Sequence, residues 1–252
     1  MSHNPEKIRE YLDDRGSSIN WRIECFEEID STNSYLMGHP ECSYRACLAD
    51  QQSAGRGRRG RAWGAKKGGA ILMSMSWSLN GGVPIGLSLV SGIAVVRALR
   101  ESGLSSAELK WPNDVLVDGQ KLCGILVELT SNRCVIGIGL NLDLGDGPGV
   151  DVDYPWTDFV RLDLDFDRDR IAADLMFHHE ILVKQCLNSG FAGFVDDWNA
   201  LHYFKNKTVE VSKDGETFCG RALGVDKLGT LIVETKEGLR QLSSAEFKVR
   251  VQ

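Results

Sequence analysis

The sequence lacks the features that mark membrane-spanning, secreted and metal-knuckle proteins. No run of about 18 apolar residues is present, and residues 1–16 carry charge without the apolar centre of a signal peptide. The seven cysteines include no C-x-x-C pair, which predicts reduced thiols with neither a disulfide framework nor a zinc knuckle. We therefore expect a cytoplasmic protein without a membrane partner.

An excess of positive charge is also missing. The 29 basic and 35 acidic side chains give a net charge of −6, which argues against bulk attraction to nucleic acid or anionic lipid. Any anion site must therefore be local. The chain of 252 residues has an ordinary hydrophobic content of 42%, and it is long enough for one large domain that carries a small one.

The first part of the chain, residues 24–142, alternates short apolar runs with turn residues and indicates mostly strand. The run AILMSMSW at 70–77 has the period of two that is typical of a half-buried strand. A helix is expected from Pro84 to the residue before Gly103, because proline opens and glycine closes an apolar repeat with helical spacing.

Further along, turn signals and periodicity predict a hairpin, a strand and a second helix. Asp118-Gly119 separates two apolar runs and favours a tight primed turn, and residues 134–142 read as the next strand. Residues 165–189 carry apolar side chains on one helical stripe. The short apolar runs from 207 onward, broken by glycine, predict a small β domain. We expect the domain boundary to separate 1–204 from 205–252.

A strongly cationic stretch is the most unusual local feature. Residues 55–68 begin GRGRRGRAW and hold six positive charges without one acid. Glycine lets backbone N–H groups approach a ligand, and arginine offers a planar fork of donors suited to phosphate or carboxylate. A bound polyanion would remove the self-repulsion and order the segment as a lid. The alternatives are a solvated basic loop and a nucleic-acid patch.

A second polar cluster raises the odds of a small-anion site. KWPND at 110–114 and KLCG at 121–124 flank the predicted hairpin turn, so Lys110 and Lys121 are expected on paired strands, where both ammonium groups could converge. Asn113 and Asp114 are suited to orient a sugar or a hydrated magnesium ion.

Five motifs in order resemble the biotin protein ligases. They are STN (31–33), QQSAGRGRRGRAW (51–63), KWPND (110–114), KLCGILVE (121–128) and GIGLN (137–141). The resemblance implies an α+β fold, in which a mixed, mainly antiparallel sheet with packed helices forms the ligase-like catalytic domain. It also implies a small C-terminal SH3-like β-barrel.

The resemblance further implies a two-step reaction. Biotin and ATP would give biotinyl-5′-AMP and pyrophosphate, and a lysine of biotin carboxyl carrier protein would then take the biotinyl group. Only 30 residues precede STN, so DNA binding is not expected, and the protein would be a monomer or a homodimer. The competing interpretations are a lipoate ligase of the same fold and an RNA-binding module built on the basic loop.

By the same resemblance, Arg58 and Lys121 are the catalytic cations on the carboxylate and α-phosphate, and Asp114 is a candidate Mg²⁺ ligand. Cys123 reads as a buried thiol, although a related octanoyl transferase group uses a cysteine. The residues expected at biotin are Ser31, Thr32, Asn33, Gln52, Gly55, Arg56, Arg58, Lys121 and Gly124. The residues expected at ATP or the adenylate are Arg56, Arg59, Arg61, Trp63, Lys110, Asn113, Asp114, Asn141 and Arg250.

Overall fold

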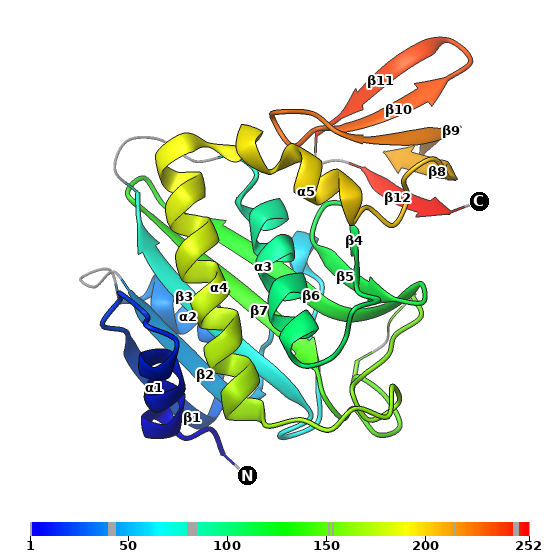
Figure 1. The fold of residues 1–252 in the computed structure, drawn as a ribbon. Coiled ribbons are helices and arrows are strands. Elements are labelled where there is room, and N and C mark those ends of the chain that lie inside the picture. The colour runs from blue at the N-terminus through cyan, green and yellow to red at the C-terminus, as the bar shows by residue number, and fades with distance from the viewer. Residues whose placement is uncertain are drawn as a thin grey trace.

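The computed structural model describes residues 2–39, 44–79, 85–150, 152, 154–213, 215–243 and 247–251. These residues form a seven-stranded mixed sheet, packed helices and a second, five-stranded antiparallel sheet (Figure 1). The predicted α+β architecture is confirmed. Pro84, the expected start of the first long helix, and Cys42 lie outside the described residues.

The large sheet has the order β1-β2-β3-β7-β6-β5-β4. Only the β1–β2 pair is parallel, and the other neighbours run antiparallel. The sheet is therefore mixed but mainly antiparallel, as expected. Its strands are β1 (Arg22–Ile29), β2 (Arg45–Gln52), β3 (Ala70–Ser78), β4 (Glu108–Lys110), β5 (Asp114–Val117), β6 (Gln120–Leu129) and β7 (Arg133–Asn141).

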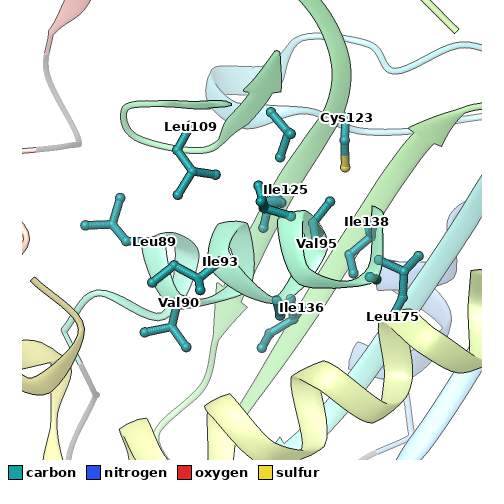
Figure 2. Close-up of a cluster of buried hydrophobic side chains, with 14 of the residues drawn as sticks. Leu89, Val90, Ile93, Val95, Leu109, Cys123, Ile125, Ile136, Ile138 and Leu175 are labelled. Atoms are coloured by element: carbon teal, nitrogen blue, oxygen red, sulfur yellow. The ribbon is translucent and has the colours of Figure 1, made fainter. Parts of the chain in front are cut away.

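Two long helices, α3 (Leu87–Glu101) and α4 (Arg168–Ser189), cover one face of the large sheet, and α1 (Pro5–Asp14) packs beside α4 (Figure 1). Apolar side chains of α3 interleave there with those of β6 and β7, including Ile125 and Ile136 (Figure 2). The whole predicted stripe of α4 is buried, which confirms that helix. No helix in the described part of the chain combines the length and apolar character needed to cross a bilayer.

A short helix, α2 (Thr32–Met37), lies on the opposite face of the sheet. Its Leu36 packs with Cys47 and Val135, whereas Leu48, the next residue of β2, points into the large core. Because α2 covers this side, β3 is buried on both faces from Ala70 to Trp77, and the expectation of a half-buried strand was wrong.

The hairpin between β5 and β6 matches the sequence prediction. Asp118 and Gly119 have φ values of 49° and 75°, the left-handed pair that a primed turn requires. The expectation that Lys110 and Lys121 sit on directly paired strands was wrong. β4 pairs with β5, which pairs in turn with β6, so one strand separates the two lysines.

The second sheet has the order β11-β10-β9-β8-β12. Its neighbouring strands all pair antiparallel, which confirms the expected C-terminal β structure, and within the described residues no pairing between β11 and β12 closes the sheet into a barrel. Trp111 fastens it to the large domain, because its Nε1 donates to Gly229 O at 3.1 Å. Its strands are β8 (Thr208–Lys213), β9 (Glu216–Val225), β10 (Leu231–Thr235), β11 (Gly238–Leu242) and β12 (Lys248–Val251).

Two short 3₁₀ helices and one α-helix complete the described elements. The first, η1 (Arg58–Gly60), lies inside the cationic stretch. The second, η2 (Phe191–Phe194), follows α4 and leads directly into α5 (Val195–Ala200). Phe191, Phe194 and Trp198 from these two elements are buried, so this connection packs against the core before the second sheet begins.

Candidate active site

A cavity of about 190 Å³ opens where α2, the cationic loop (residues 53–69), the β4–β6 strands and β12 meet. Most of the site residues expected from the sequence line it, although they come from five separate stretches of chain. Gly55 and Asn141 do not line it. The predicted residues in its wall are Ser31, Thr32, Asn33, Gln52, Arg56, Arg58, Arg59, Arg61, Trp63, Lys110, Asn113, Asp114, Lys121, Gly124 and Arg250.

One end of the cavity is polar and uncharged. Ser31 caps α2, and its side chain accepts from Ser34 N at 3.4 Å. Thr32 donates to Gln52 Oε1 from its backbone N at 2.7 Å and from its hydroxyl at 3.1 Å. The hydroxyl oxygens of Ser74 and Thr32 lie 2.7 Å apart. This network holds amide and hydroxyl groups in fixed positions, which suits a neutral ligand group with both donors and acceptors.

Asn33 links this network to Glu128. Its Nδ2 donates to Glu128 Oε2 at 2.7 Å, and its Oδ1 accepts from Ser74 Oγ at 2.6 Å. Glu128 also accepts from Arg56 Nη2 at 2.8 Å. The carboxylate therefore joins the polar end of the cavity to the cationic loop.

The cationic loop is a compact hairpin over the cavity. Arg56 forms an antiparallel bridge with Ala62, and Gly57 N donates to Arg61 O at 2.7 Å. Arg58 Nη1 donates to Asn113 Oδ1 at 3.1 Å, which ties the loop to the β4–β5 turn. Burial, and then the neighbouring Arg59, lower the pKa of Arg58, and Asp114 partly opposes them.

Gly55 lies behind this hairpin. Trp63 N donates to Gly55 O at 2.9 Å, and a Cβ added to Gly55 would lie 2.3 Å from Trp63 O. The glycine is therefore needed for close backbone packing at the base of the loop.

Trp63 lies against two glycines of the sheet. A Cβ added to Gly139 would come within 2.3 Å of its indole, and one added to Gly124 would come within 2.7 Å. The Lys121 ammonium lies 5.2 Å from its ring centroid. Trp63 Nε1 is buried with no hydrogen-bond partner among the described residues. The indole thus forms an aromatic wall of the cavity, and its Nε1–H could donate a hydrogen bond to a ligand.

Lys121 is the most deeply placed cation of the cavity. Its Nζ lies 2.7 Å from Asp114 Oδ1 and 4.8 Å from the ring centroid of Tyr154. Burial is the largest single influence and lowers the pKa of Lys121, but Asp114 and, after it, Tyr154 together raise it, and the resulting pKa lies above the ordinary lysine value. The site therefore holds a positive charge at neutral pH.

Asn141 supports Lys121 from behind. Its Nδ2 donates to Thr157 O at 3.0 Å and to Lys121 O at 3.3 Å. Lys121 N also donates to Pro155 O, and Thr157 N donates to Lys121 O. Because its amide is committed to these carbonyls, Asn141 fixes the strand that carries the cation and does not face the cavity in this structure.

Cys123 and the His178-His179 pair stand apart from the cavity. Cys123 is fully buried in the core, and burial raises its pKa, so it is a core thiol as expected. His179 is also buried and bonds Leu175 O through Nδ1 at 2.7 Å. Within the described ranges, no group of three or more His, Cys, Asp or Glu side chains is arranged to hold a metal.

The sequence matches two family models and a set of characterised relatives. The model of the Biotin/lipoate A/B protein ligase family covers residues 25–144, and that of the Biotin protein ligase C terminal domain covers residues 205–250. The Bifunctional ligase/repressor BirA of Escherichia coli (strain K12) is 35% identical in an alignment 231 positions long that covers 88% of this chain and 72% of that protein. The chain belongs to the biotin protein ligase family.

Other members of the family are similar over almost their whole length. The Biotin–[acetyl-CoA-carboxylase] ligase of Mycobacterium tuberculosis is 31% identical in an alignment 250 positions long that covers 91% of this ligase and 92% of that one. The biotin protein ligase of Aquifex aeolicus, solved in complex with biotin and ATP, superposes with a TM-score of 0.80 at 27% identity. That match covers 92% of this ligase and 99% of the Aquifex chain.

Several cavity residues of this ligase were not found by sequence reasoning. Tyr154 follows a loop without any motif. Lys248 approaches from β12 and Phe247 from the residue before it, more than 100 residues beyond Lys121. Only Arg250 was expected from that strand. The repeated glycines of GIGLN, Gly137 and Gly139, were a usable signal, since bare backbone in a central strand leaves room for another group to approach.

Proposed function

We propose that this protein is an ATP-dependent biotin–[acetyl-CoA-carboxylase] ligase. It activates biotin as biotinyl-5′-AMP and transfers the biotinyl group to a lysine of biotin carboxyl carrier protein. The observation that carries the proposal is the polarity of one cavity, which is lined by the uncharged Ser31, Thr32 and Gln52 and also by Arg58 and the charged, largely buried Lys121.

The first step joins two anions, which like charge opposes. Arg58 and Lys121 would neutralise the biotin carboxylate and the α-phosphate while a carboxylate oxygen attacks the α-phosphorus. A carboxyl O–P bond forms, the bond from the α-phosphorus to the bridging oxygen breaks, and pyrophosphate leaves with that electron pair. No protein nucleophile is needed, which agrees with the position of Cys123 in the core, where burial raises its pKa and disfavours the thiolate.

The cavity residues are compatible with a magnesium ion that binds together with the ATP triphosphate. Mg²⁺ is usually held by one or two carboxylates together with substrate phosphates, and Asp114 is a carboxylate in the cavity wall. When bound, it would supply additional neutralisation of phosphate charge. Asn113, Lys110 and Arg250 are the further groups at hand for the nucleotide.

In the second step, the lysine amine of the carrier protein attacks the acyl carbon of the adenylate. A C–N bond forms, the C–O bond to phosphate breaks, AMP leaves, and the amine loses a proton. The mixed anhydride must be kept from water until the carrier arrives. Trp63 and the Arg56 side chain are the groups of the loop that we assign to this cover, with Arg59 and Arg61 near the pyrophosphate.

We also propose that the catalytic unit spans 1–204 and that 205–252 form a second domain that completes the nucleotide site. The start of the second sheet at Thr208 supports this division. The position of Phe247 and Lys248 in the cavity wall supports a direct role for that domain in ligand binding.

The decisive experiment is pyrophosphate exchange. The protein is incubated with ATP, Mg²⁺ and labelled pyrophosphate, with biotin or with lipoate as the acid. Biotin-dependent formation of labelled ATP supports the proposal. Lipoate-dependent exchange would instead assign a lipoate ligase, and the absence of both, together with RNA binding through the basic loop, would assign a binding module.

A further inference from the structure

The cationic loop leaves the sheet after β2 and returns at β3, and one arginine from a distant helix contacts both ends. Arg168, the first residue of α4, places its Nη2 3.3 Å from Asp50 Oδ1 on β2 and donates to Ala70 O, the start of β3, at 3.4 Å. A Cβ added to Gly68 would lie 3.5 Å from Arg168 Nη1. Gly68 N donates to Asp50 O at 2.8 Å, so the two ends and the guanidinium form one cluster.

The cluster is buried from solvent. The side chain of Asp50 is 4% exposed and that of Arg168 is 13% exposed. A contact between such groups is little screened by water, in contrast to an ordinary surface ion pair. The guanidinium therefore fixes the positions at which the loop leaves and rejoins the sheet.

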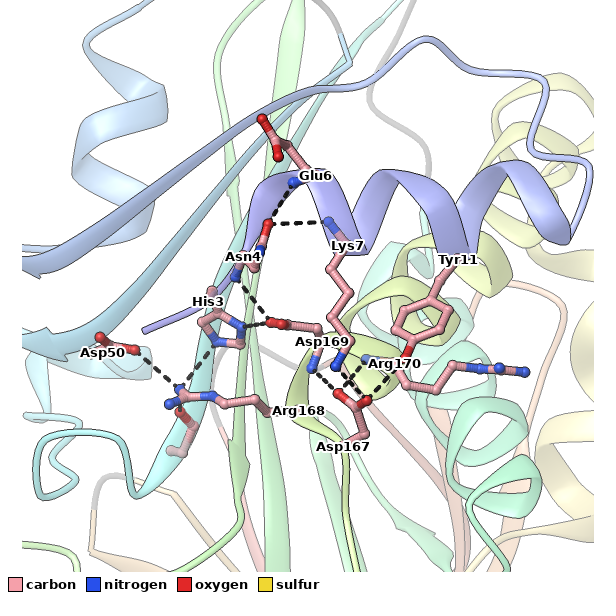
Figure 3. Close-up of polar contacts among 11 residues, drawn as sticks. His3, Asn4, Glu6, Lys7, Tyr11, Asp50, Asp167, Arg168, Asp169 and Arg170 are labelled. Atoms are coloured by element: carbon pink, nitrogen blue, oxygen red, sulfur yellow. Dashed lines mark hydrogen bonds and ion pairs between the residues drawn. The ribbon is translucent and has the colours of Figure 1, made fainter. Parts of the chain in front are cut away.

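The amino-terminal segment holds the arginine in place. His3 lies 3.2 Å from Arg168 Nη2 through its Nε2, and 3.0 Å from Asp169 Oδ1 through its Nδ1 (Figure 3). The neutral tautomer with its proton on Nδ1 satisfies both contacts, since Nδ1–H then donates to Asp169 and Nε2 accepts from Arg168. Asn4 N also donates to Asp169 Oδ1 at 3.2 Å, which anchors the start of α1.

We propose that Arg168 is a positioning residue for the cationic loop and that His3 orients it. Neither residue lines the cavity. The loop carries Arg56, Arg58 and Trp63, and reaction rates are sensitive to small misplacements of such groups. His3 and Asn4 thereby help to hold the loop that carries out the reaction, although they lie far from that loop in the sequence. The catalytic part of this inference rests on the proposed function.

The first test measures the loop itself, in the full-length protein without substrates. Trypsin cleaves after arginine, so the loop offers cleavage sites at Arg56, Arg58, Arg59 and Arg61 whose use mass spectrometry can map. Losing one hydrogen bond of the cluster should raise the rate of cleavage within the loop about five- to tenfold in His3→Ala and in Arg168→Lys. Arg168→Lys keeps the positive charge beside Asp50, so this variant is expected to stay folded, and faster cleavage in it would report on the loop and not on general unfolding.

A matched control separates loop anchoring from a general loosening of α1. Lys7 joins α1 to Asp167 at 2.7 Å through side chains that are about two-fifths exposed. Lys7→Ala should leave loop cleavage at the wild-type rate. Equal acceleration in Lys7→Ala and His3→Ala, or no acceleration in His3→Ala and Arg168→Lys, would overturn the proposal.

The second test follows biotin-dependent pyrophosphate exchange. Both variants should lower kcat about ten- to hundredfold with a much smaller change in KM for biotin, because the polar end of the cavity is untouched. A wild-type kcat with a faster-cleaved loop would remove the positioning role. If no preparation, including the wild type, exchanges, the proposed function fails, while the cleavage rates still decide whether Arg168 anchors the loop.

Discussion

Replacing Lys121 with alanine should abolish most adenylate formation while leaving the protein folded. The side chain provides a buried positive charge 2.7 Å from Asp114 and faces the cavity beside Trp63. In the proposed reaction this charge is needed most when the carboxylate and the α-phosphate meet, and water is largely excluded there. The variant therefore removes an interaction that is strongest in the transition state.

The expected magnitude follows from two separate effects. Loss of one preorganised charge-stabilising group lowers kcat by about 10²–10³, or roughly 2.7–4 kcal/mol. The same change strands the Asp114 carboxylate, whose side chain is 19% exposed. Losing a partner costs about 3–5 kcal/mol in a fully buried pair, and partial exposure should reduce this to about 1–3 kcal/mol of stability.

Three variants separate these effects. Lys121→Ala and the double variant with Asp114→Asn are compared in biotin-dependent pyrophosphate exchange and in urea unfolding. The double variant should recover part of the stability but not the activity. Lys67→Ala makes the same charge change at an exposed residue outside the cavity and should exchange like the wild type. Near-wild-type exchange in Lys121→Ala at saturating ligands would refute the catalytic assignment.

Gly137→Ala should cost about 1–3 kcal/mol in urea unfolding, since its Cβ would lie 2.2 Å from Asn33 Oδ1. Gly193→Ala, where nothing lies within 4 Å, is the control, and equal losses would contradict the packing argument. Cys123→Ala should change kcat by no more than about twofold, and a drop as large as that of Lys121→Ala would assign chemistry to the thiol. His179 has its pKa lowered from 6.5 to about 4 by burial, so the unfolded chain binds the proton first. The contribution of His179 to stability should be complete above about pH 6.5 and decrease by about 3 kcal/mol toward pH 4. Burial also lowers the pKa of His202, to about 3, so His179→Gln should make the decrease smaller by about 3 kcal/mol without removing it, and an unchanged pH profile would contradict the assignment.

The parts of the fold that could be predicted are those fixed by neighbouring residues. Asp118-Gly119 specifies its own turn, and Asp167 caps α4 by accepting from Asp169 N and Arg170 N. Both signals are local and do not depend on the rest of the molecule. The burial of both faces of β3 was not predictable in this way. The polar Ser74 of β3 suggests an exposed face, but its hydroxyl finds hydrogen-bond partners on α2, and these allow it to be buried.

The same distinction explains the outcome for the site. The cationic loop and KWPND are contiguous motifs, so their residues were found together. Tyr154 and Phe247 reach the cavity through tertiary packing, and no local pattern marks them. Asn141 was grouped with the ligand residues because it ends a recognisable motif. Its amide instead bonds Lys121 O and Thr157 O, a commitment that only the folded chain reveals.

The pairing of Lys121 with Asp114 resolves a conflict that burial creates. A lysine buried alone loses its proton as its pKa decreases, and it then has no charge to offer an incoming anion. Asp114 keeps the ammonium charged and, among the described residues, is the single carboxylate paired with it, while the rings of Tyr154 and Trp63 lie at 4.8 Å and 5.2 Å from the ammonium. Phosphate or carboxylate oxygens that enter the cavity can therefore bind the Lys121 ammonium while it stays paired with Asp114. A chain with a net charge of −6 can thus present a strong local cation to two anionic substrates. The nearest partner, Asp114, determines whether Lys121 is protonated, and the net charge of the whole protein does not.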